Sequence, residues 1–260
     1  MAGDGNRVFT AAVRLQFRLL LRNPTEIATL VLLPLQALGI YAVVSLAGDG
    51  DLVGIAIIAP AIMATWQNAL YLIGDVVHKD RDAGRLEYLT AGAHSYFQYL
   101  LGRACAITAY SIALFVLSLA VGGIMLNIRV SNSVIPQLLL VAVLTCVAVG
   151  LTGLLLSVFF IFAKSPHTYQ NALGYPIFIV GGVLVPPDLY PAPIQFVSHW
   201  IFLSWSAEAM RSLVRGAVPE SLWTTIAMLT GSCIVIACIA SWAIGRAVER
   251  LREKGEFNLA

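Results

Sequence analysis

Several apolar runs of about twenty residues constrain this chain most, because a run of that length crosses the hydrocarbon core of a bilayer as one helix. In lipid, backbone N–H and C=O groups need internal partners, so spanning segments are helices or a closed barrel. The runs lack the apolar/polar alternation of barrel strands. Only 12% of the 260 residues are charged, against about 25% in a typical soluble domain. The sequence therefore predicts an all-α polytopic membrane protein.

Six transmembrane helices are expected within a single domain, residues 1–260. The predicted spans are residues 27–46, 52–73, 104–128, 134–163, 169–185 and 222–245. The second span should continue as a helix past Asp75, out of the membrane. Residues 194–216 contain too many prolines and polar groups for a lipid-facing span. For the whole segment 186–216, a re-entrant helical hairpin that dips into the outer leaflet fits better.

Residues 7–23 are predicted to form an amphipathic helix in the membrane interface, because basic and apolar residues fall on opposite sides of a helical wheel. The basic side has Arg7, Arg14, Arg18 and Arg22, and the apolar side has Phe9, Val13, Phe17 and Leu20. A plain extension of the first span is the alternative. Pro24 argues against it, because proline breaks a helix.

The distribution of positive charge predicts the orientation. With six spans, all but three of the 16 Lys and Arg residues fall on the side of the two termini; the exceptions are Arg129, Arg211 and Arg215. Lys and Arg concentrate on the cytoplasmic side of membrane proteins. We therefore expect a multi-pass protein of the cell (plasma) membrane with both termini in the cytoplasm.

The most polar interruption, residues 78–103, lies between the second and third spans. Leu86, Leu89 and Ala93 recur at helical spacing and predict a short helix with one apolar face. Gly92 is suited to end that helix, and Ser95 with Gln98 forms a capping box that starts the next one. A short helix in polar surroundings, held between two spans, is suited to dock onto something outside the membrane.

Motifs for nucleotide binding or catalysis are missing from the sequence. There is no G-x-x-x-x-G-K-[ST] loop, no G-x-S-x-G, no H-E-x-x-H and no pair of catalytic carboxylates. The four histidines fall on different predicted loops, so we expect no catalytic residue and no metal site. Acidic residues near the middle of a span are also missing, which argues against an ion-coupled carrier. The energy source for any transport stays open at this point.

Polar and aromatic residues inside two predicted spans are the candidates for contact with a ligand. The second span holds Trp66, Gln67 and Asn68, and the fifth holds Tyr169, Asn171, Tyr175 and Phe178. Amides in a membrane need partners, either across a helix interface or along a ligand or water path. The residues alone leave both interpretations open.

Three short motifs carry a family resemblance. Residues 84–89 read G-R-L-E-Y-L, residues 182–186 read G-V-L-V-P, and residues 208–216 read E-A-M-R-S-L-V-R-G. In this order and with a basic N-terminal helix, they resemble the permease subunit of an ABC exporter of the type-2 class, which exports drugs, lipids and polysaccharides. The sequence departs from that family at Ala93-His94, where a proline usually follows the coupling helix.

The resemblance implies a transport subunit that is not itself an enzyme. Two separate ABC ATPase subunits would bind ATP and Mg²⁺, and a second permease chain would complete a homo- or heterodimer. ATPase closure would drive alternating access by pushing on the loop between the second and third spans. The cargo would be a small amphipathic drug, antibiotic or lipid, with a polysaccharide or glycan as the alternative, and no nucleic acid is expected as a partner.

The resemblance also assigns roles to residues. The ATPase-coupling residues would be Asp80, Gly84, Arg85, Leu86, Glu87 and Leu89. The substrate path between the second and fifth spans would include Trp66, Gln67, Asn68, Asn171, Tyr175 and Phe178. The re-entrant hairpin would depend on Pro186, Glu208 and Arg211.

Overall fold

The structure, a computed structural model, describes residues 2–24, 53–82, 84, 93–125, 131–161, 163 and 165–254, with scattered positions between 28 and 46. These residues form helices and turns, and no strand occurs among them. The all-α prediction is therefore confirmed. Apart from the scattered positions, the predicted first span lies outside the described residues, as does the core of the polar loop, residues 85–92.

Four helical segments in the described part of the chain are long and apolar enough to cross a membrane. They are Gly54–Arg81, Tyr96–Ile124, Ile135–Phe160 and Leu222–Arg250, and they match the predicted second, third, fourth and sixth spans. The first comprises α3 (Val53–Gln67), the π-helix η2 (Asn68–Ile73) and α4 (Asp75–Asp82). The others are α6 (Ala93–Met125), α7 (Ile135–Ile161) and α11 (Leu222–Lys254). The second span does continue past Asp75 as a helix, as predicted.

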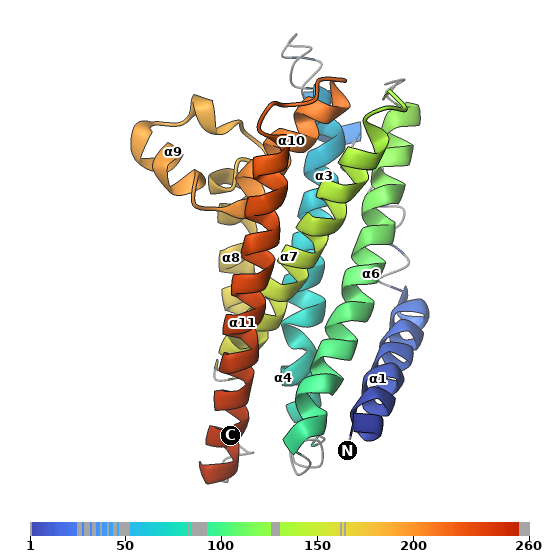
Figure 1. The fold of residues 1–260 in the computed structure, drawn as a ribbon, viewed down its shortest axis with the longest axis vertical. Helices are drawn as coiled ribbons and strands as arrows, with labels where there is room; N and C mark the ends of the chain where they lie inside the picture. Colours follow the sequence, from blue (N-terminus) through green and yellow to red (C-terminus); the bar gives the residue numbers. More distant parts are fainter. Residues whose placement is uncertain are drawn as a thin grey trace.

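The chain between α7 and α11 forms shorter helices. These are α8 (Pro166–Val180), the 3-10 turn η3 (Pro187–Leu189), α9 (Ala192–Ser198) and α10 (Phe202–Val214). The predicted fifth span extends to residue 185, but α8 ends at Val180 because the chain turns at Gly181 and Gly182. In Figure 1, η3 and α9 project to one side near the upper end, and α10 lies beside the upper ends of α3 and α7.

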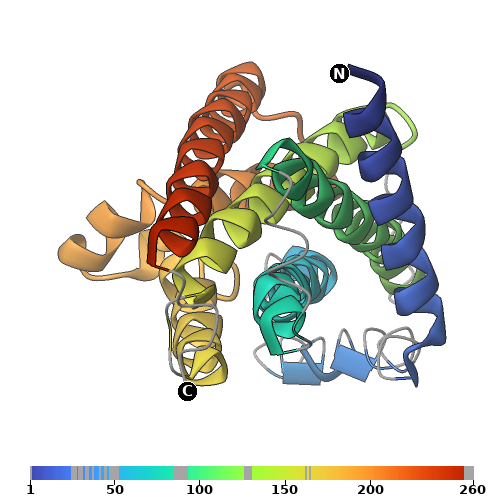
Figure 2. The same cartoon turned by 90° about the horizontal axis from the view of Figure 1, so that it is seen from below.

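Helix α1 (Ala2–Arg22) crosses the lower end of the molecule alongside α6, the same end at which α11 finishes (Figures 1 and 2). A helix is thus present over the predicted residues 7–23, but its buried face differs from the expected one. Ala12, Gln16 and Leu20 are buried at four-residue spacing, whereas Phe17 is exposed. The small Ala12 and the polar Gln16 face α6 because Gln16 has a partner there.

Two apolar clusters hold the described helices together. The larger one joins α3, η2, α6, α7, α8, α10 and the upper part of α11, with Ile62, Leu70 and Phe160 among its fully buried side chains. The smaller one lies at the lower end, where residues of α1, α4, α6, α7 and α11 meet around Tyr96 and Ile107. The lower ends of these five helices therefore form one packed unit.

Candidate functional site

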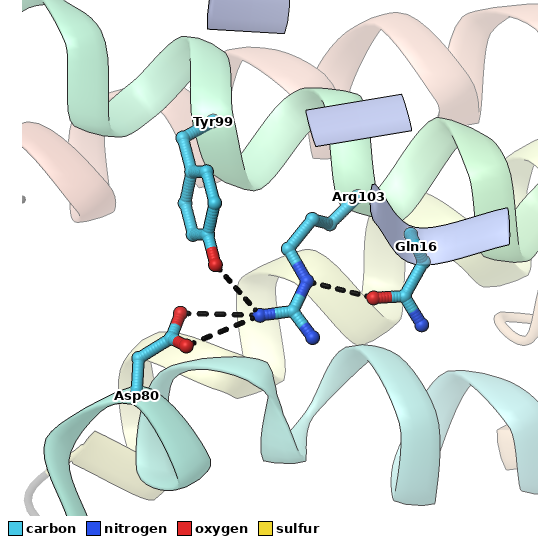
Figure 3. A network of polar contacts seen from close by, with 4 residues as sticks. All are labelled: Gln16, Asp80, Tyr99 and Arg103. Atoms are coloured by element: carbon cyan, nitrogen blue, oxygen red, sulfur yellow. Dashed lines mark hydrogen bonds and ion pairs between the residues drawn. The ribbon is translucent and has the colours of Figure 1, made fainter. Parts of the chain in front are cut away.

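Four polar side chains from three helices meet at the lower end of the molecule (Figure 3). Arg103 of α6 donates from Nη1 to both carboxylate oxygens of Asp80 on α4, each at 3.2 Å. Its Nε donates to Oε1 of Gln16 on α1 at 2.7 Å, and Nη1 also donates to the Tyr99 hydroxyl at 2.9 Å. We refer to these four residues as the Arg103 cluster.

The Arg103 cluster is buried, so its charges are stable only with suitable partners. Arg103 is 5% exposed and Asp80 is fully buried, and a buried charge is tolerated only when it is paired and hydrogen-bonded. Tyr99 adds its ring, whose centroid lies 5.5 Å from the guanidinium carbon. The sequence places Arg103 in the polar loop; the structure buries it instead, because α1 and α4 enclose it with matching partners.

The Arg103 cluster connects both ends of the predicted coupling loop. Asp80 lies in the last turn of α4, just before residues 83–92, and Arg103 lies about three turns after the start of α6, which follows them. Gln16 adds α1 to the same contact. The Arg103 cluster therefore joins α1, α4 and α6, and α4 and α6 are the helices that flank residues 83–92.

The predicted ATPase-coupling residues divide into two groups. Arg85, Leu86, Glu87 and Leu89 lie outside the described residues. Gly84 is exposed, with a φ of 63°, in the turn that follows α4. Asp80 is buried against Arg103, so in this structure its carboxylate contacts other parts of this chain and presents no surface to a partner. The docking role of the other five residues stays a prediction.

A π-helix interrupts the second span where the sequence predicts a continuous α-helix. In a π-helix each N–H bonds to the carbonyl five residues earlier, as Gly74 N does to Ala69 O at 3.0 Å. The carbonyl of Leu70 accepts a bond from Nε2 of Gln170 on α8 at 3.0 Å. Single π turns inside α-helices are frequent at functional sites, and this one joins the second span to α8.

Gln170 also binds the acidic residue that follows the π-helix. Its Nε2 donates to Oδ1 of Asp75 at 2.5 Å, and its Oε1 lies 2.9 Å from Nδ1 of His167. Asp75 Oδ2 lies 3.6 Å from Nζ of Lys79. Asp75 follows the predicted second span, yet it is only 3% exposed because α8 covers it. The sequence signal for this contact was an acidic residue, Asp75, and an amide residue, Gln170, in two apolar segments.

An apolar cavity of about 330 Å³ lies between the second span, α7 and α8. Trp66 forms part of its wall, with Leu173, Pro176 and Ile177 of α8 and Thr152 of α7 among the other lining residues. The Trp66 indole Nε1 is buried and has no hydrogen-bond partner among the described residues. A buried donor without a partner in the protein is available to a ligand or a water molecule.

The other predicted path residues lie away from this cavity. Asn68 is buried and its Nδ2 donates to Ser111 Oγ on α6 at 3.0 Å, which is an interhelical hydrogen bond. Phe178 is buried in the larger apolar cluster, whereas Tyr175 is 70% exposed. Exposed Asn171 accepts a bond from the Tyr71 hydroxyl at 2.5 Å. Gln67 is half-buried. The residues of α8 that line the cavity are at positions 173, 176, 177 and 180, which share one side of the helix, and none of them is a predicted path residue.

The residues assigned to the predicted hairpin have distinct environments. Arg211 of α10 is buried, and its Nη1 donates to the Gly182 carbonyl at 2.7 Å. Gly182 has a φ of 66°, and a Cβ there would lie 2.9 Å from Pro187 Cγ. The glycine and the arginine of the two hairpin motifs thus stabilise one turn, because only glycine fits this backbone without strain. Pro186 precedes η3 and is half-buried, and Glu208 is exposed.

No group of three or more His, Cys, Asp or Glu side chains that could hold a metal ion occurs among the described residues. The polar side chains of the Arg103 cluster and of the Gln170–Asp75 contact bind one another through hydrogen bonds and ion pairs. These sites are suited to hold helices in position rather than to activate a reacting group.

Comparison with known proteins gives one match. A family model described as ABC-2 type transporter matches residues 7–214, from α1 to the end of α10. No curated protein matches the chain, and no solved structure matches it.

Proposed function

Because the chain belongs to the ABC-2 type transporter family, we propose that it is the membrane-spanning subunit of an ATP-driven exporter. In this proposal it moves a small amphipathic drug, antibiotic or lipid out of the cytoplasm or the inner leaflet. The match is to a family of transport permeases, which is consistent with a chain whose sequence has no P-loop.

The observation that best supports ATP-driven coupling is the Arg103 cluster. A permease driven by a separate ATPase needs a mechanical connection from the docking loop to the spans. Here the two helices flanking residues 83–92 and helix α1 are joined by one buried ion pair and its hydrogen bonds. A push on the loop would move these helices as one unit.

The proposed complex contains two copies of an ABC ATPase and a second permease chain. ATP and Mg²⁺ would be bound by the ATPases, and this chain would contribute the loop of residues 83–92. We propose six spans, with α8 and residues 27–46 added to the four long apolar segments. Both termini and the lower end in Figure 1 would face the cytoplasm of a cell membrane.

The cavity beside Trp66 favours an amphipathic cargo over a glycan. Its lining residues are apolar apart from Thr152 and the Trp66 indole. A glycan site needs many hydrogen-bond partners for hydroxyl groups, because a polar group that is desolvated without partners is costly. A polysaccharide or glycan exporter of the same class is therefore the second candidate.

Reconstitution with the cognate ATPase tests the proposal. The two proteins should co-purify, and ATP hydrolysis in liposomes should rise when an amphipathic substrate is added and should accompany its movement. A chain that purifies without any ATPase, or an ATPase rate that no amphipathic compound changes, would contradict the proposal. Stimulation by oligosaccharides alone would favour the second candidate.

Substitution of Leu86 or Glu87 by Arg should uncouple hydrolysis from transport while the spans stay folded. Transport should fall tenfold or more, because a central interface side chain contributes about 2 kcal/mol or more. Transport per hydrolysed ATP is the measurement. Val218→Arg, an exposed position before α11, is the matched control and should behave as wild type; wild-type transport by both loop variants would remove the docking role.

Substitution of Trp66 by Ala should change which compounds are exported more than it changes basal ATP hydrolysis, because it alters the wall of the cavity. We expect the same of Asn68→Ala if its amide faces the path. Ser111→Ala removes the same hydrogen bond without touching the path. Transport assays with a panel of compounds compare the three variants; identical profiles for Asn68→Ala and Ser111→Ala would make Asn68 a packing residue.

A further inference from the structure

A groove of about 200 Å³ lies near the lower end of α11, where that helix meets α7. Its lining residues are Val158 of α7 and Trp242, Ala243, Arg246, Ala247 and Arg250 of α11. The groove shares no lining residue with the Arg103 cluster or with the cavity beside Trp66. All of it except Val158 lies beyond the residues matched by the family model.

The order of side chains along α11 passes from apolar to basic. Trp242, Arg246 and Arg250 follow one another at four-residue spacing, so they lie on one side of the helix about 6 Å apart along its axis. Trp242 is 65% exposed, and tryptophan is enriched at the level of the lipid headgroups. The two arginines therefore lie one and two turns further toward the water than an interfacial tryptophan.

The positive charge of the groove is not neutralised within the described part of the chain. The guanidinium carbon of Arg246 lies 5.7 Å from the centroid of the Trp242 ring, which supports the side chain without removing its charge. Among the described residues, no side-chain hydrogen bond or ion pair involves the guanidinium group of Arg246 or Arg250. Glu249 is exposed and does not line the groove.

We propose that this groove binds an anionic phospholipid of the inner leaflet. The phosphate of the headgroup would accept hydrogen bonds from Arg246 and Arg250, because guanidinium matches phosphate geometry. The upper part of an acyl chain would lie along Trp242, Ala243 and Val158. Basic pockets beside transmembrane helices on the cytoplasmic side are suited to such headgroups. The proposal rests on the proposed membrane topology and is independent of the transport activity.

A phospholipid fits better than a soluble anion. The floor of the groove is formed by Val158, Ala243, Ala247 and the Trp242 ring, and a free phosphate would leave this apolar surface in contact with water. A lipid covers the apolar floor and neutralises the basic rim at the same time. One phospholipid would therefore contact both the apolar floor and the basic rim of the groove.

Quenching of Trp242 fluorescence by brominated lipids tests the proposal. The full chain, with the ATPase that accompanies it, is placed in nanodiscs of one fixed mixture of phosphatidylglycerol and phosphatidylcholine. Bromine is carried by one lipid or by the other, so the bilayer charge never changes. The Trp242 signal is the difference between wild type and Trp242→Phe, since the chain has five tryptophans. We expect quenching by brominated phosphatidylglycerol to exceed quenching by brominated phosphatidylcholine. The ratio should be about fivefold for each arginine that contacts the headgroup.

Two double variants of equal charge give the comparison. Arg246→Gln/Arg250→Gln should lower the preference for phosphatidylglycerol to near one, whereas Arg14→Gln/Arg18→Gln, which changes two exposed arginines of α1, should keep it. The ratio of the two brominated lipids within each variant cancels any change in the brightness of Trp242.

Three results would overturn the proposal. A wild-type preference near one would show that the groove does not select anionic lipid. An equal loss in Arg14→Gln/Arg18→Gln would assign the effect to general surface charge. The third result is loss of the preference under one added condition. Loss on addition of inorganic phosphate would assign the arginines to a soluble anion, and loss only when the ATPase is bound would assign them to the partner protein.

Discussion

Substitution of Asp80 by Ala is expected to destabilise the folded chain by about 3–5 kcal/mol, because it leaves the guanidinium of Arg103 buried without its counter-charge. Arg103→Ala should cost a similar amount, since it leaves the Asp80 carboxylate unpaired. The measurement is equilibrium unfolding in mixed micelles, supported by size-exclusion chromatography after heating. In variants that still assemble, we also expect transport per hydrolysed ATP to fall, because the two flanks of the docking loop are no longer joined.

The double variant Asp80→Ala/Arg103→Ala separates charge from packing. It removes both charges together, so it should be less damaging than the sum of the single variants. Lys79→Ala is the matched control, because Lys79 pairs with Asp75 at 3.6 Å while its side chain is 58% exposed. Lys79 is largely in water and the buried Asp75 keeps its hydrogen bond from Gln170, so Lys79→Ala should cost less than Asp80→Ala. Wild-type stability of Asp80→Ala would contradict the account of the Arg103 cluster.

Substitution of Gln170 by Leu is expected to cost about 2–5 kcal/mol, because two buried acceptors lose their donor at once. The Leu70 carbonyl in the π-helix and the Asp75 carboxylate both accept from Gln170 Nε2, and Gln170 itself is fully buried. Leucine has a similar size, so the loss should come from the hydrogen bonds rather than from a cavity. The same unfolding titration measures it.

Asn171→Ala is the neighbouring control for Gln170→Leu. Asn171 is exposed and has one hydrogen bond, from Tyr71, so its removal should cost about 1 kcal/mol or less. If both variants lose the same stability, the buried bonds of Gln170 contribute no more than the exposed Tyr71–Asn171 bond, which also joins the π-helix to α8. A selective loss in Gln170→Leu would show that the two spans are joined at this point.

The spans were predictable because membrane insertion is a local property. The cost of placing a residue in lipid adds along the segment, so the apolar runs alone indicated the helices that became α3, α6, α7 and α11. The same argument predicted the end of the fifth span, residues 169–185, less well, because the turn at Gly181 and Gly182 ends α8 at Val180. Residues 194–216, for which polar composition predicted no lipid-facing span, contain parts of two short helices in the structure.

The partners of the buried polar groups were decided by the tertiary structure. Arg103 and Asp80 are 23 positions apart, and Gln170 and Asp75 are 95 positions apart. Spacing along the chain says nothing about such pairs, because they depend on how helices pack. The sequence by itself determined that this chain is helical and has segments able to cross a membrane. Only packing decided which polar residues are buried and paired, since a buried charge takes its partner from whichever helix lies beside it.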